Sequence, residues 1–250
     1  MRSFFYYREH LIIVTELLRQ NLFEFNKFIL DHGEVPYFTM TRLCYLTRQI
    51  LIALNYIHNL GLIHSDVKPE NILIASYSRA RVKLIDFGSS CFITDRQSSY
   101  IQSRSYRAPE VILGLPYDGK IDIWSLGCVV AEMFTGQVTF QNRSVVSMLS
   151  RIEAICGPFP RHLTMNGKYS AKFFTPNGLI YETIDKDDIT KNNDDEHDGS
   201  ITNHAVLDTD EDCFNLYTPK RTTLAERLGF SADLMEKSRD TLEVCIECEI

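Results

Sequence analysis

Hydrophobic residues recur three and four positions apart over much of this chain, a spacing that predicts amphipathic helices. The longest such run lies between Thr41 and Gly61, and its apolar positions are Leu43, Leu46, Ile50, Leu54 and Ile57. The same spacing predicts further helices at 22–30, 122–136, 144–155 and 222–228. We interpret the 41–61 stripe as the buried face of a core helix.

Short runs rich in β-branched residues interrupt this helical pattern and predict strands. One run lies near the start, at 11–14, and two others, at 72–74 and 82–85, are separated by a predicted turn at 76–80. A further strand is expected around Ile63, before a polar loop. Strands of this length beside longer helices predict an α+β fold.

The pattern weakens between residues 185 and 212, a segment rich in Asn, Asp, Thr and Gly. It has 11 acidic and two basic residues, whereas the whole chain has a formal charge of -7. We therefore interpret it as a flexible acidic insertion, either a solvated spacer, which we favour, or a docking segment for a basic partner. A chain with this charge balance lacks the basic stripe of a nucleic-acid-binding protein.

Membrane and secretory classes are also disfavoured by the sequence. No apolar stretch approaches the roughly 20 residues of a membrane span, and charged residues interrupt the first ten positions. The seven cysteines are scattered, which suits reduced thiols in an intracellular protein of the cytoplasm or nucleus. Cys245 and Cys248 form a lone C-x-x-C, for which a metal or redox role is the less favoured interpretation.

The candidate chemistry lies in the sequence His-Ser-Asp-Val-Lys-Pro-Glu-Asn at 64–71 and in an Asp-Phe-Gly that begins at Asp86. Phosphoryl transfer needs a carboxylate that orients the attacking hydroxyl, a cation beside the transferred phosphate and oxygen ligands for Mg²⁺. The loop supplies Asp66, Lys68 and Asn71, and the end of the following strand supplies Asp86. Because the loop and the strand end flank a tight hairpin, these four groups can converge.

These motifs resemble those of the protein kinase superfamily. Ala-Pro-Glu at 108–110 and Asp-Ile-Trp-Ser-Leu-Gly at 122–127 follow in the order of that family, the second on the helix that supports the catalytic loop. The resemblance implies ATP and Mg²⁺ as cofactors, with Asp66 as catalytic base and Lys68 near the γ-phosphate. It also implies that Asn71 and Asp86 are the Mg²⁺ ligands.

Three segments, 88–91, 99–107 and 216–221, resemble the dual-specificity tyrosine-regulated kinases (DYRK family). The resemblance implies that Tyr100 is autophosphorylated and that Arg104 and Arg107 bind its phosphate through charge-assisted hydrogen bonds. The alternative is a packed aromatic ring with two solvated arginines. Ser65 stands where most kinases have an arginine, so we do not expect that position to bind a phosphate.

The resemblance also predicts an adenine site at the start of the chain. Thr15 would be the gatekeeper, the backbone of Glu16 and Leu18 would meet adenine, and Leu73 would form the floor. The family's glycine-rich loop and strand lysine have no counterpart in this sequence, so we expect a fold that is mainly the helical C-terminal lobe, with most of the N-terminal lobe absent.

The expected organisation is a remnant of the N-lobe strand and hinge at 1–18, a C-lobe at 19–228 and a divergent tail at 229–250. Apolar residues of the first segment, such as Ile13 and Val14, would then be uncovered. We expect such a chain to aggregate or to associate with a chaperone.

The leading hypothesis is a protein serine/threonine kinase that modifies tyrosine only on itself and whose partners are proteins with Ser or Thr acceptors. A non-catalytic, kinase-like binding module is the first alternative, because the upstream elements are missing from the sequence. A small-molecule phosphotransferase is the second, and it is disfavoured because such enzymes do not share Lys-Pro-Glu at 68–70 or Ala-Pro-Glu at 108–110.

Overall fold

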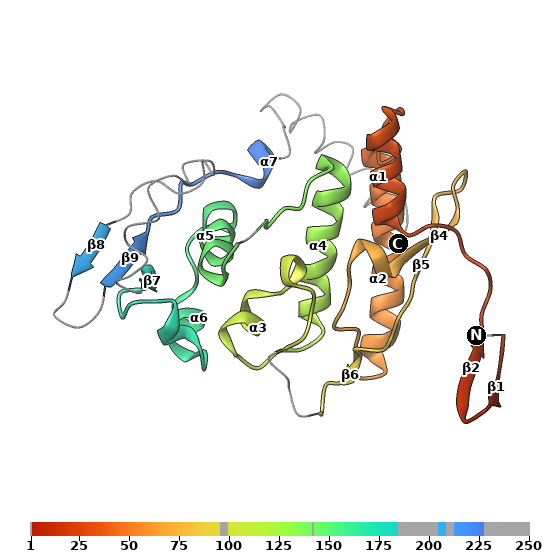
Figure 1. The fold of residues 1–250 in the computed structure, drawn as a ribbon, viewed down its shortest axis with the longest axis horizontal. Helices are drawn as coiled ribbons and strands as arrows, with labels where there is room; N and C mark the ends of the chain where they lie inside the picture. The colour runs from red at the N-terminus through yellow and green to blue at the C-terminus, as the bar shows by residue number, and fades with distance from the viewer. Residues whose placement is uncertain (1, 96–99, 142, 185–204, 209–212, 228–250) are drawn as a thin grey trace.

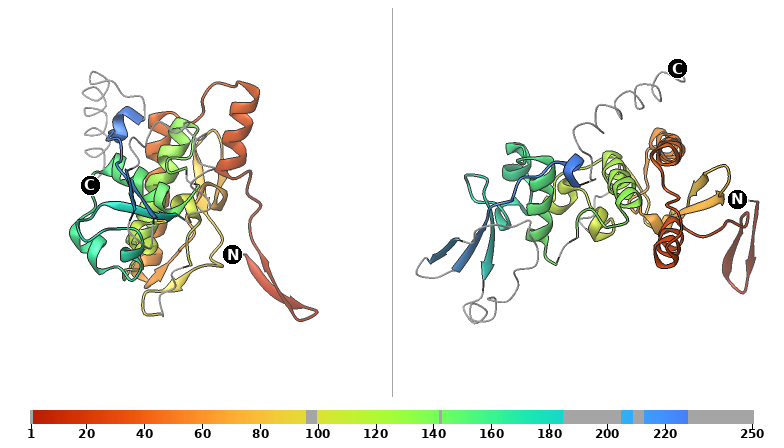
Figure 2. Two further views of the ribbon diagram at one scale, coloured as in Figure 1. Left: turned by 60° about the vertical axis from the view of Figure 1, so that its left-hand side comes forward. Right: turned by 90° about the horizontal axis from the view of Figure 1, so that it is seen from above.

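The computed structural model describes residues 2–95, 100–141, 143–184, 205–208 and 213–227. Three helices, α1 (Leu22–His32), α2 (Met40–Asn59) and α4 (Lys120–Thr135), lie at its centre (Figure 1). An N-terminal hairpin lies at one end of the molecule, and a small sheet lies at the other end (Figures 1 and 2). The predicted α+β composition is confirmed.

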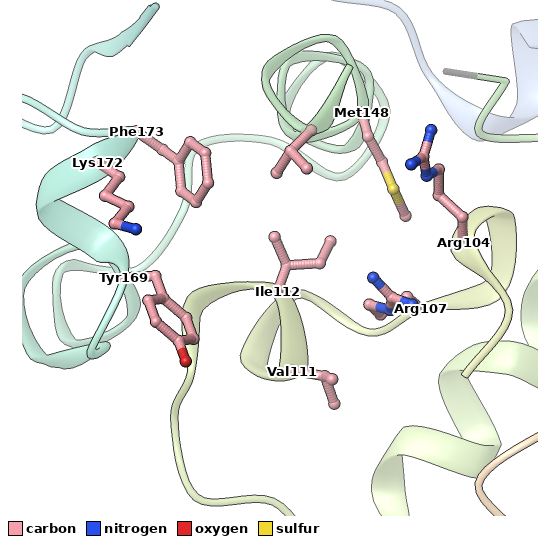
Figure 3. Close-up of a pocket in the computed structure, with 9 residues that line it drawn as sticks. Arg104, Arg107, Val111, Ile112, Met148, Tyr169, Lys172 and Phe173 are labelled. Atoms are coloured by element: carbon pink, nitrogen blue, oxygen red, sulfur yellow. The ribbon is translucent and has the colours of Figure 1, made fainter. Parts of the chain in front are cut away.

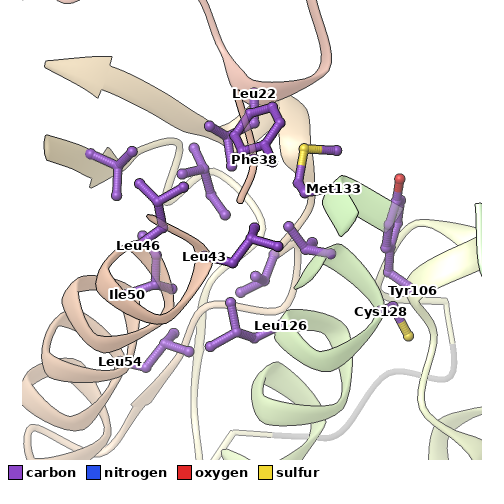
Figure 4. Packing of buried hydrophobic residues seen from close by; sticks show 14 of the residues in the cluster. Leu22, Phe38, Leu43, Leu46, Ile50, Leu54, Tyr106, Leu126, Cys128 and Met133 are labelled. Atoms are coloured by element: carbon purple, nitrogen blue, oxygen red, sulfur yellow. The ribbon is translucent and has the colours of Figure 1, made fainter. Parts of the chain in front are cut away.

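The main hydrophobic core forms where α2 packs against α4 (Figure 4). Helix α2 begins after Thr39, whose side chain accepts a hydrogen bond from the backbone of Arg42 and so satisfies a free helix amide. All five apolar positions predicted for its inner face are buried. Burial of each such Leu or Ile side chain contributes about 1.5–3 kcal/mol, so this stripe is a main source of stability.

Two antiparallel pairs of strands frame the polar loop. β4 (Ile72–Ser76) pairs with β5 (Arg81–Leu84), and β3 (Leu62–Ile63) pairs with β6 (Cys91–Phe92). The second pair joins segments on either side of residues 64–90. This pairing brings the two ends of the 64–90 segment close together. The polar loop after β3 and the residues after β5 therefore lie next to each other.

The N-terminal hairpin consists of β1 (Ser3–Tyr7) and β2 (His10–Val14), which confirms the strand predicted at 11–14. Its two turn residues, Arg8 and Glu9, both have positive φ, as a tight two-residue hairpin turn requires. The hairpin projects away from the helices (Figure 2). Consequently Phe4 and Ile13, which face each other in the register, remain 57% and 56% exposed.

The second half of the chain adds helices around α4. These are α3 (Pro109–Leu113), α5 (Val145–Cys156), α6 (Arg161–Asn166) and α7 (Leu224–Arg227). The described residues also form the 3₁₀ turns η1 (Pro69–Asn71), η2 (Arg104–Tyr106) and η3 (Ser170–Lys172). Helix α5 starts with a capping box between Ser144 and Ser147, which explains its sharp beginning. No helix within the described ranges is long and apolar enough to span a membrane.

A three-stranded sheet at the far end was not predicted. It consists of β7 (Ile180–Ile184), β9 (Cys213–Tyr217) and β8 (Ala205–Asp208), in that order. Strand β8 lies inside the 185–212 segment, so the expectation of no regular structure is wrong for 205–208. These four residues become a strand because β9 offers them a partner, which local periodicity does not reveal. The rest of that segment and the tail at 229–250 lie outside the described residues.

Candidate active site

Asp66 lies between β3 and η1 with three donors directed at its carboxylate. Lys68 Nζ is 2.7 Å from Oδ2, Ser103 Oγ donates to Oδ1 at 2.8 Å, and Asn71 Nδ2 donates to Oδ2 at 3.1 Å. The structure thus brings Asp66, Lys68 and Asn71 together, as the sequence predicted. Ser103, which the sequence did not single out, joins them from a segment 37 residues away.

These contacts lower the pKa of Asp66. Partial burial alone would raise the pKa of this carboxyl group, but the hydrogen bonds from Lys68, Ser103 and Asn71 and the charge of Lys68 outweigh it and hold the pKa below its usual value. Asp66 is therefore ionised at neutral pH. An ionised, held carboxylate is suited to orient a hydroxyl group and to accept its proton.

We expect Ser103→Ala to raise the pKa of Asp66, because a hydrogen bond that favours the charged form is lost. Because the rate falls when Asp66 is protonated, the acid limb of the pH–rate profile should move to higher pH. The same shift affects stability: a carboxyl group whose pKa is depressed by folding adds stability above its unfolded pKa, and that stability is lost as pH falls through the folded pKa. Ser105→Ala, in the 3₁₀ turn η2 that directly follows Ser103, is the control, and equal profiles for both variants would contradict the assignment.

Asp86 follows Ile85, whose backbone N–H and carbonyl both form hydrogen bonds with the 64–71 loop. Ile85 donates its backbone N–H to Asn71 O at 2.9 Å and accepts from His64 Nε2 at 3.0 Å. Asp86 itself is exposed, has a φ of 64° and accepts a hydrogen bond from Gly88 N through Oδ1. The structure thus places it beside Asn71 without a direct contact between the two side chains.

The oxygen atoms of Asn71 and Asp86 fit a hard divalent cation. Asn71 uses its Nδ2 toward Asp66, which leaves Oδ1 as the possible ligand atom. Among the described residues there is no cluster of three or more His, Cys, Asp or Glu side chains that could hold a metal. Mg²⁺ is typically held by one or two carboxylates together with water and substrate phosphates. One amide and one carboxylate are therefore enough protein ligands for this ion.

The side chain of Asp122 in α4 is fully buried and binds the backbone at the start of the 64–71 loop. Its Oδ2 accepts from the backbone of His64 at 2.8 Å and its Oδ1 from the backbone of Ser65 at 2.9 Å. His58 Nε2, from the last turn of α2, donates to the same carboxylate at 2.8 Å. The predicted support of the loop by this helix is confirmed, and the contribution of His58 is new.

Ser65 is fully buried and has a φ of 65°. Its carbonyl accepts from Gln102 N at 3.0 Å, and its Oγ lies 3.6 Å from Cys91 Sγ. A side chain enclosed in this way cannot reach a phosphate in solvent. The expectation that this position does not bind phosphate is consistent with its burial.

Gln102 attaches residues 100–107, which resemble part of the kinase activation segment and are given that name below, to α4. Its Nε2 donates to Ile121 O at 2.9 Å and to Ser125 Oγ at 2.7 Å, while its Oε1 accepts from Ala108 N at 2.9 Å. The residue is buried with a φ of 62°. Only the fold reveals this role, because a lone glutamine in the sequence has no distinguishing pattern.

The predicted adenine site lies where the chain leaves the hairpin. Arg19 N donates to Ile74 O at 2.9 Å and Ile74 N donates to Gln20 O at 3.0 Å, which places the segment after Leu18 beside β4 and Leu73. Thr15 and Glu16 are exposed, and the side chain of Glu16 pairs with Lys83 of β5. The structure thus brings Leu18 and Leu73 onto neighbouring segments, whereas their role toward a nucleotide stays a prediction.

Tyr100 lies at the surface, 87% exposed, with Arg107 Cζ 5.7 Å from the centre of its ring. Arg107 is anchored by hydrogen bonds from Nε to Ile101 O and from Nη2 to Gln102 O, both 2.8 Å. Burial lowers the pKa of this guanidinium. Arg104 is exposed and lines the same pocket as Arg107 (Figure 3). The ring is thus exposed, and the role of Tyr100 as a phosphorylation site stays a prediction.

Comparison with known proteins gives a consistent result. A family model described as the protein kinase domain matches residues 1–228. A probable serine/threonine-protein kinase dyrk2 of Dictyostelium discoideum is 42% identical over 178 residues, which are 71% of this chain and 19% of that protein. The human dual specificity tyrosine-phosphorylation-regulated kinase 4 is 40% identical over 179 residues, 72% of this chain and 34% of that protein.

A probable dual specificity protein kinase YAK1 homolog of Encephalitozoon cuniculi is 42% identical over 180 residues, 70% of this chain and 42% of that protein. In these comparisons the chain matches between about a fifth and two fifths of the length of its curated relatives.

Proposed function

This chain belongs to the protein kinase family, within its dual-specificity tyrosine-regulated group, and on that premise we propose that its protein transfers the γ-phosphate of ATP to serine and threonine hydroxyls of other proteins. Tyrosine is modified only on the protein itself, at Tyr100. The observation that supports this function most strongly is the carboxylate of Asp66, held by Lys68, Ser103 and Asn71.

The geometry supports the following reaction. The acceptor hydroxyl donates its proton to Asp66 while its oxygen forms a bond to the γ-phosphorus, and the bond from that phosphorus to the β–γ bridging oxygen breaks to release ADP. Lys68 stabilises negative charge on the transferred group. Asn71 and Asp86 would hold Mg²⁺, which would neutralise charge at the phosphates. In this proposal Thr15 is the gatekeeper, the backbone of Glu16 and Leu18 meets the adenine, and Leu73 forms the floor beneath it.

Residues 1–18 are proposed to contribute a strand and the hinge of the upper lobe, and 19–228 the lower lobe. A non-catalytic binding module remains the alternative function. One measurement distinguishes the kinase from the binding module. It follows labelled phosphate from ATP to a protein acceptor, with the protein that contains this chain as the enzyme. Transfer that depends on Asp66 supports the kinase, whereas partner binding without any transfer supports the module.

We expect Tyr100→Phe to lower both the folding yield and the activity, because a phosphate on Tyr100 would gain charge-assisted hydrogen bonds from Arg104 and Arg107 and so order the activation segment. A loss of about tenfold in kcat/KM corresponds to roughly 1.4 kcal/mol, within the range of one such contact. Phosphotyrosine content by mass spectrometry and kinase rate are measured together. Tyr56→Phe, an exposed tyrosine on α2, is the control. An unchanged yield and rate in Tyr100→Phe would contradict the switch.

The exposed hairpin supports a proposal of chaperone association or self-association. Phe4 and Ile13 form one apolar cross-strand pair that faces solvent. Replacing both with Thr should increase the monomer fraction of this chain in size-exclusion chromatography by several-fold and reduce co-purifying chaperone. Wild-type chain that is already monodisperse and melts cooperatively would contradict the proposal.

We place the protein inside the cell, in the cytoplasm or the nucleus. Cys44, Cys91, Cys128 and Cys156 form no disulfide within the described part of the chain, which agrees with a reducing compartment. Nucleic acid and membrane partners are not proposed, because neither a basic stripe nor a long apolar segment supports them.

A further inference from the structure

A cluster of aromatic side chains lies between α1, the start of α2 and the turn that connects β4 with β5. Tyr37 donates its hydroxyl hydrogen to the backbone carbonyl of Tyr77 at 2.7 Å. Phe25 of α1 packs against both rings, with its ring centre 5.0 Å from that of Tyr37 and 4.8 Å from that of Tyr77. Helix α1 and strand β4 are in contact (Figure 1). The cluster therefore fixes two tyrosines from distant segments beside each other.

Two arginines lie over the rings of these tyrosines. Arg42 Cζ is 4.4 Å from the ring centre of Tyr37, and its Nη1 donates to the carbonyl of the same residue at 3.1 Å. Arg19 Cζ is 5.3 Å from the ring centre of Tyr77. A third arginine, Arg79, lies in the turn, two residues after Tyr77. We call these five residues the arginine–tyrosine surface. Stacking on an aromatic ring orients a guanidinium and leaves the N–H groups at its edge able to bind an anion.

The positive charges of this surface are not neutralised within the described part of the chain. Arg19, Arg42 and Arg79 are exposed, and none of them forms an ion pair with a described carboxylate. The whole chain nevertheless has a formal charge of -7. The surface is thus a local positive region on a net acidic protein, and it directs an anionic partner to one place.

The composition of the surface favours a carboxylate-rich peptide over a nucleic acid. Tyrosine and arginine are the residue types enriched at the energetic centres of protein interfaces, and a guanidinium can bind a carboxylate through two parallel hydrogen bonds. Asp31 and Glu34, at the end of α1, are exposed a few residues before Tyr37. A long phosphate backbone that continued past the surface would be repelled by these carboxylates, whereas a short acidic segment need not reach them.

Strands β4 and β5 connect this surface with the candidate active site. Asn71 directly precedes β4 and Asp86 closely follows β5, so both lie at the open end of this hairpin, whereas Tyr77 and Arg79 lie at its turn. A strand advances about 3.3 Å per residue, which places the two ends roughly 20 Å apart. A segment bound at the surface therefore leaves the acceptor position at Asp66 free. It would also raise the local concentration of a hydroxyl tethered to it.

We propose that the arginine–tyrosine surface is a docking site for an acidic segment of a partner protein. Carboxylates of that segment pair with Arg19, Arg42 and Arg79, and its chain lies over the partly exposed rings of Tyr37 and Tyr77. The binding itself requires no phosphate transfer, so it goes beyond the proposed kinase function and does not depend on it.

The test uses the 250-residue chain without ATP, taken from the monomer fraction of a size-exclusion column. The probe is a fluorescein-labelled peptide, Gly-Ser-Glu-Asp-Leu-Glu-Asp-Ser-Gly, and binding is followed by fluorescence anisotropy. We expect Arg19→Glu and Arg42→Glu each to weaken binding about 3- to 10-fold, and more at low than at high salt. A peptide with Gln and Asn in place of Glu and Asp should bind at least about tenfold more weakly.

Arg161→Glu is the matched control, because Arg161 is an exposed arginine at the start of α6, outside the surface. Arg79→Glu is a second variant, at a turn position where the described structure shows no side-chain contact that folding would lose. Circular dichroism checks that each variant is folded.

Equal affinities for the Arg19→Glu, Arg79→Glu and Arg161→Glu chains, or for the acidic and the amide peptides, would overturn the proposal. So would tighter binding of a single-stranded oligouridylate than of the acidic peptide, since the surface would then bind nucleic acid. A chain that binds the peptide in this way but transfers no phosphate would support the docking site and refute only the proposed kinase function.

Discussion

Asp66→Asn is expected to lower the rate of phosphate transfer by about 10²–10⁴-fold, the usual contribution of a positioned general base. An asparagine keeps the size of the side chain and can still accept from Ser103, but it lacks the charge that pairs with Lys68 and cannot take up the hydroxyl proton. The measurement is transfer of labelled γ-phosphate from ATP to a protein acceptor, in the protein that contains this chain and with saturating Mg²⁺.

The expected loss lies in kcat and not in the affinity for ATP, because Asp66 contacts the acceptor and not the nucleotide. Asp31→Asn, an exposed carboxylate on α1, is the control and should retain the full rate. Circular dichroism of both variants shows whether the fold is kept. If the Asp66→Asn protein transfers phosphate at the wild-type rate, the kinase mechanism proposed for this site is wrong.

Asp122→Ala is expected to lower the free energy of unfolding by about 3 kcal/mol. The substitution leaves the buried N–H groups of His64 and Ser65 without an acceptor, and each orphaned donor costs about 1–3 kcal/mol. For a chain of this size a loss of this magnitude lowers Tm by roughly 6–12 °C. Differential scanning calorimetry measures the shift.

Asp31→Ala, again at the exposed position on α1, should change stability by less than about 0.5 kcal/mol. His58→Ala removes only one of the three donors to Asp122, so a smaller loss is expected. Combining His58→Ala with Asp122→Ala should cost less than the sum of the single losses, because the two side chains share one interaction. Strict additivity, or a Tm of Asp122→Ala equal to that of the control, would contradict this account of the loop.

The helices and the catalytic loop could be predicted from local sequence because their signals are local. The buried positions of α2, from Leu43 to Ile57, follow a spacing that any amphipathic helix must have, and the structure buries all of them. Asp66, Lys68 and Asn71 are at most five residues apart, so a short loop followed by a 3₁₀ turn is sufficient to bring them together. The chemistry that we propose for this loop could therefore be predicted without a structure.

The contacts that complete the site connect segments far apart in the chain. Ser103 reaches Asp66 across 37 residues, and Asp122 reaches the backbone of His64 across 58. Neither pairing has a local pattern, since it depends on how α4 and the activation segment pack. Strand β8 is a similar case, because a four-residue strand is defined by its partner β9 and not by its own periodicity.

The sequence by itself determined the family, the helical core and the groups that we propose for phosphate transfer, since residue type and short spacing are sufficient for each. Tertiary structure decided the contacts that lower the pKa of Asp66, the exposure of Tyr100 beside Arg107 and the pocket between Arg104 and Lys172. These properties depend on which distant side chains surround a group and how much water they leave around it. Burial and long-range hydrogen bonds arise only when the whole chain packs.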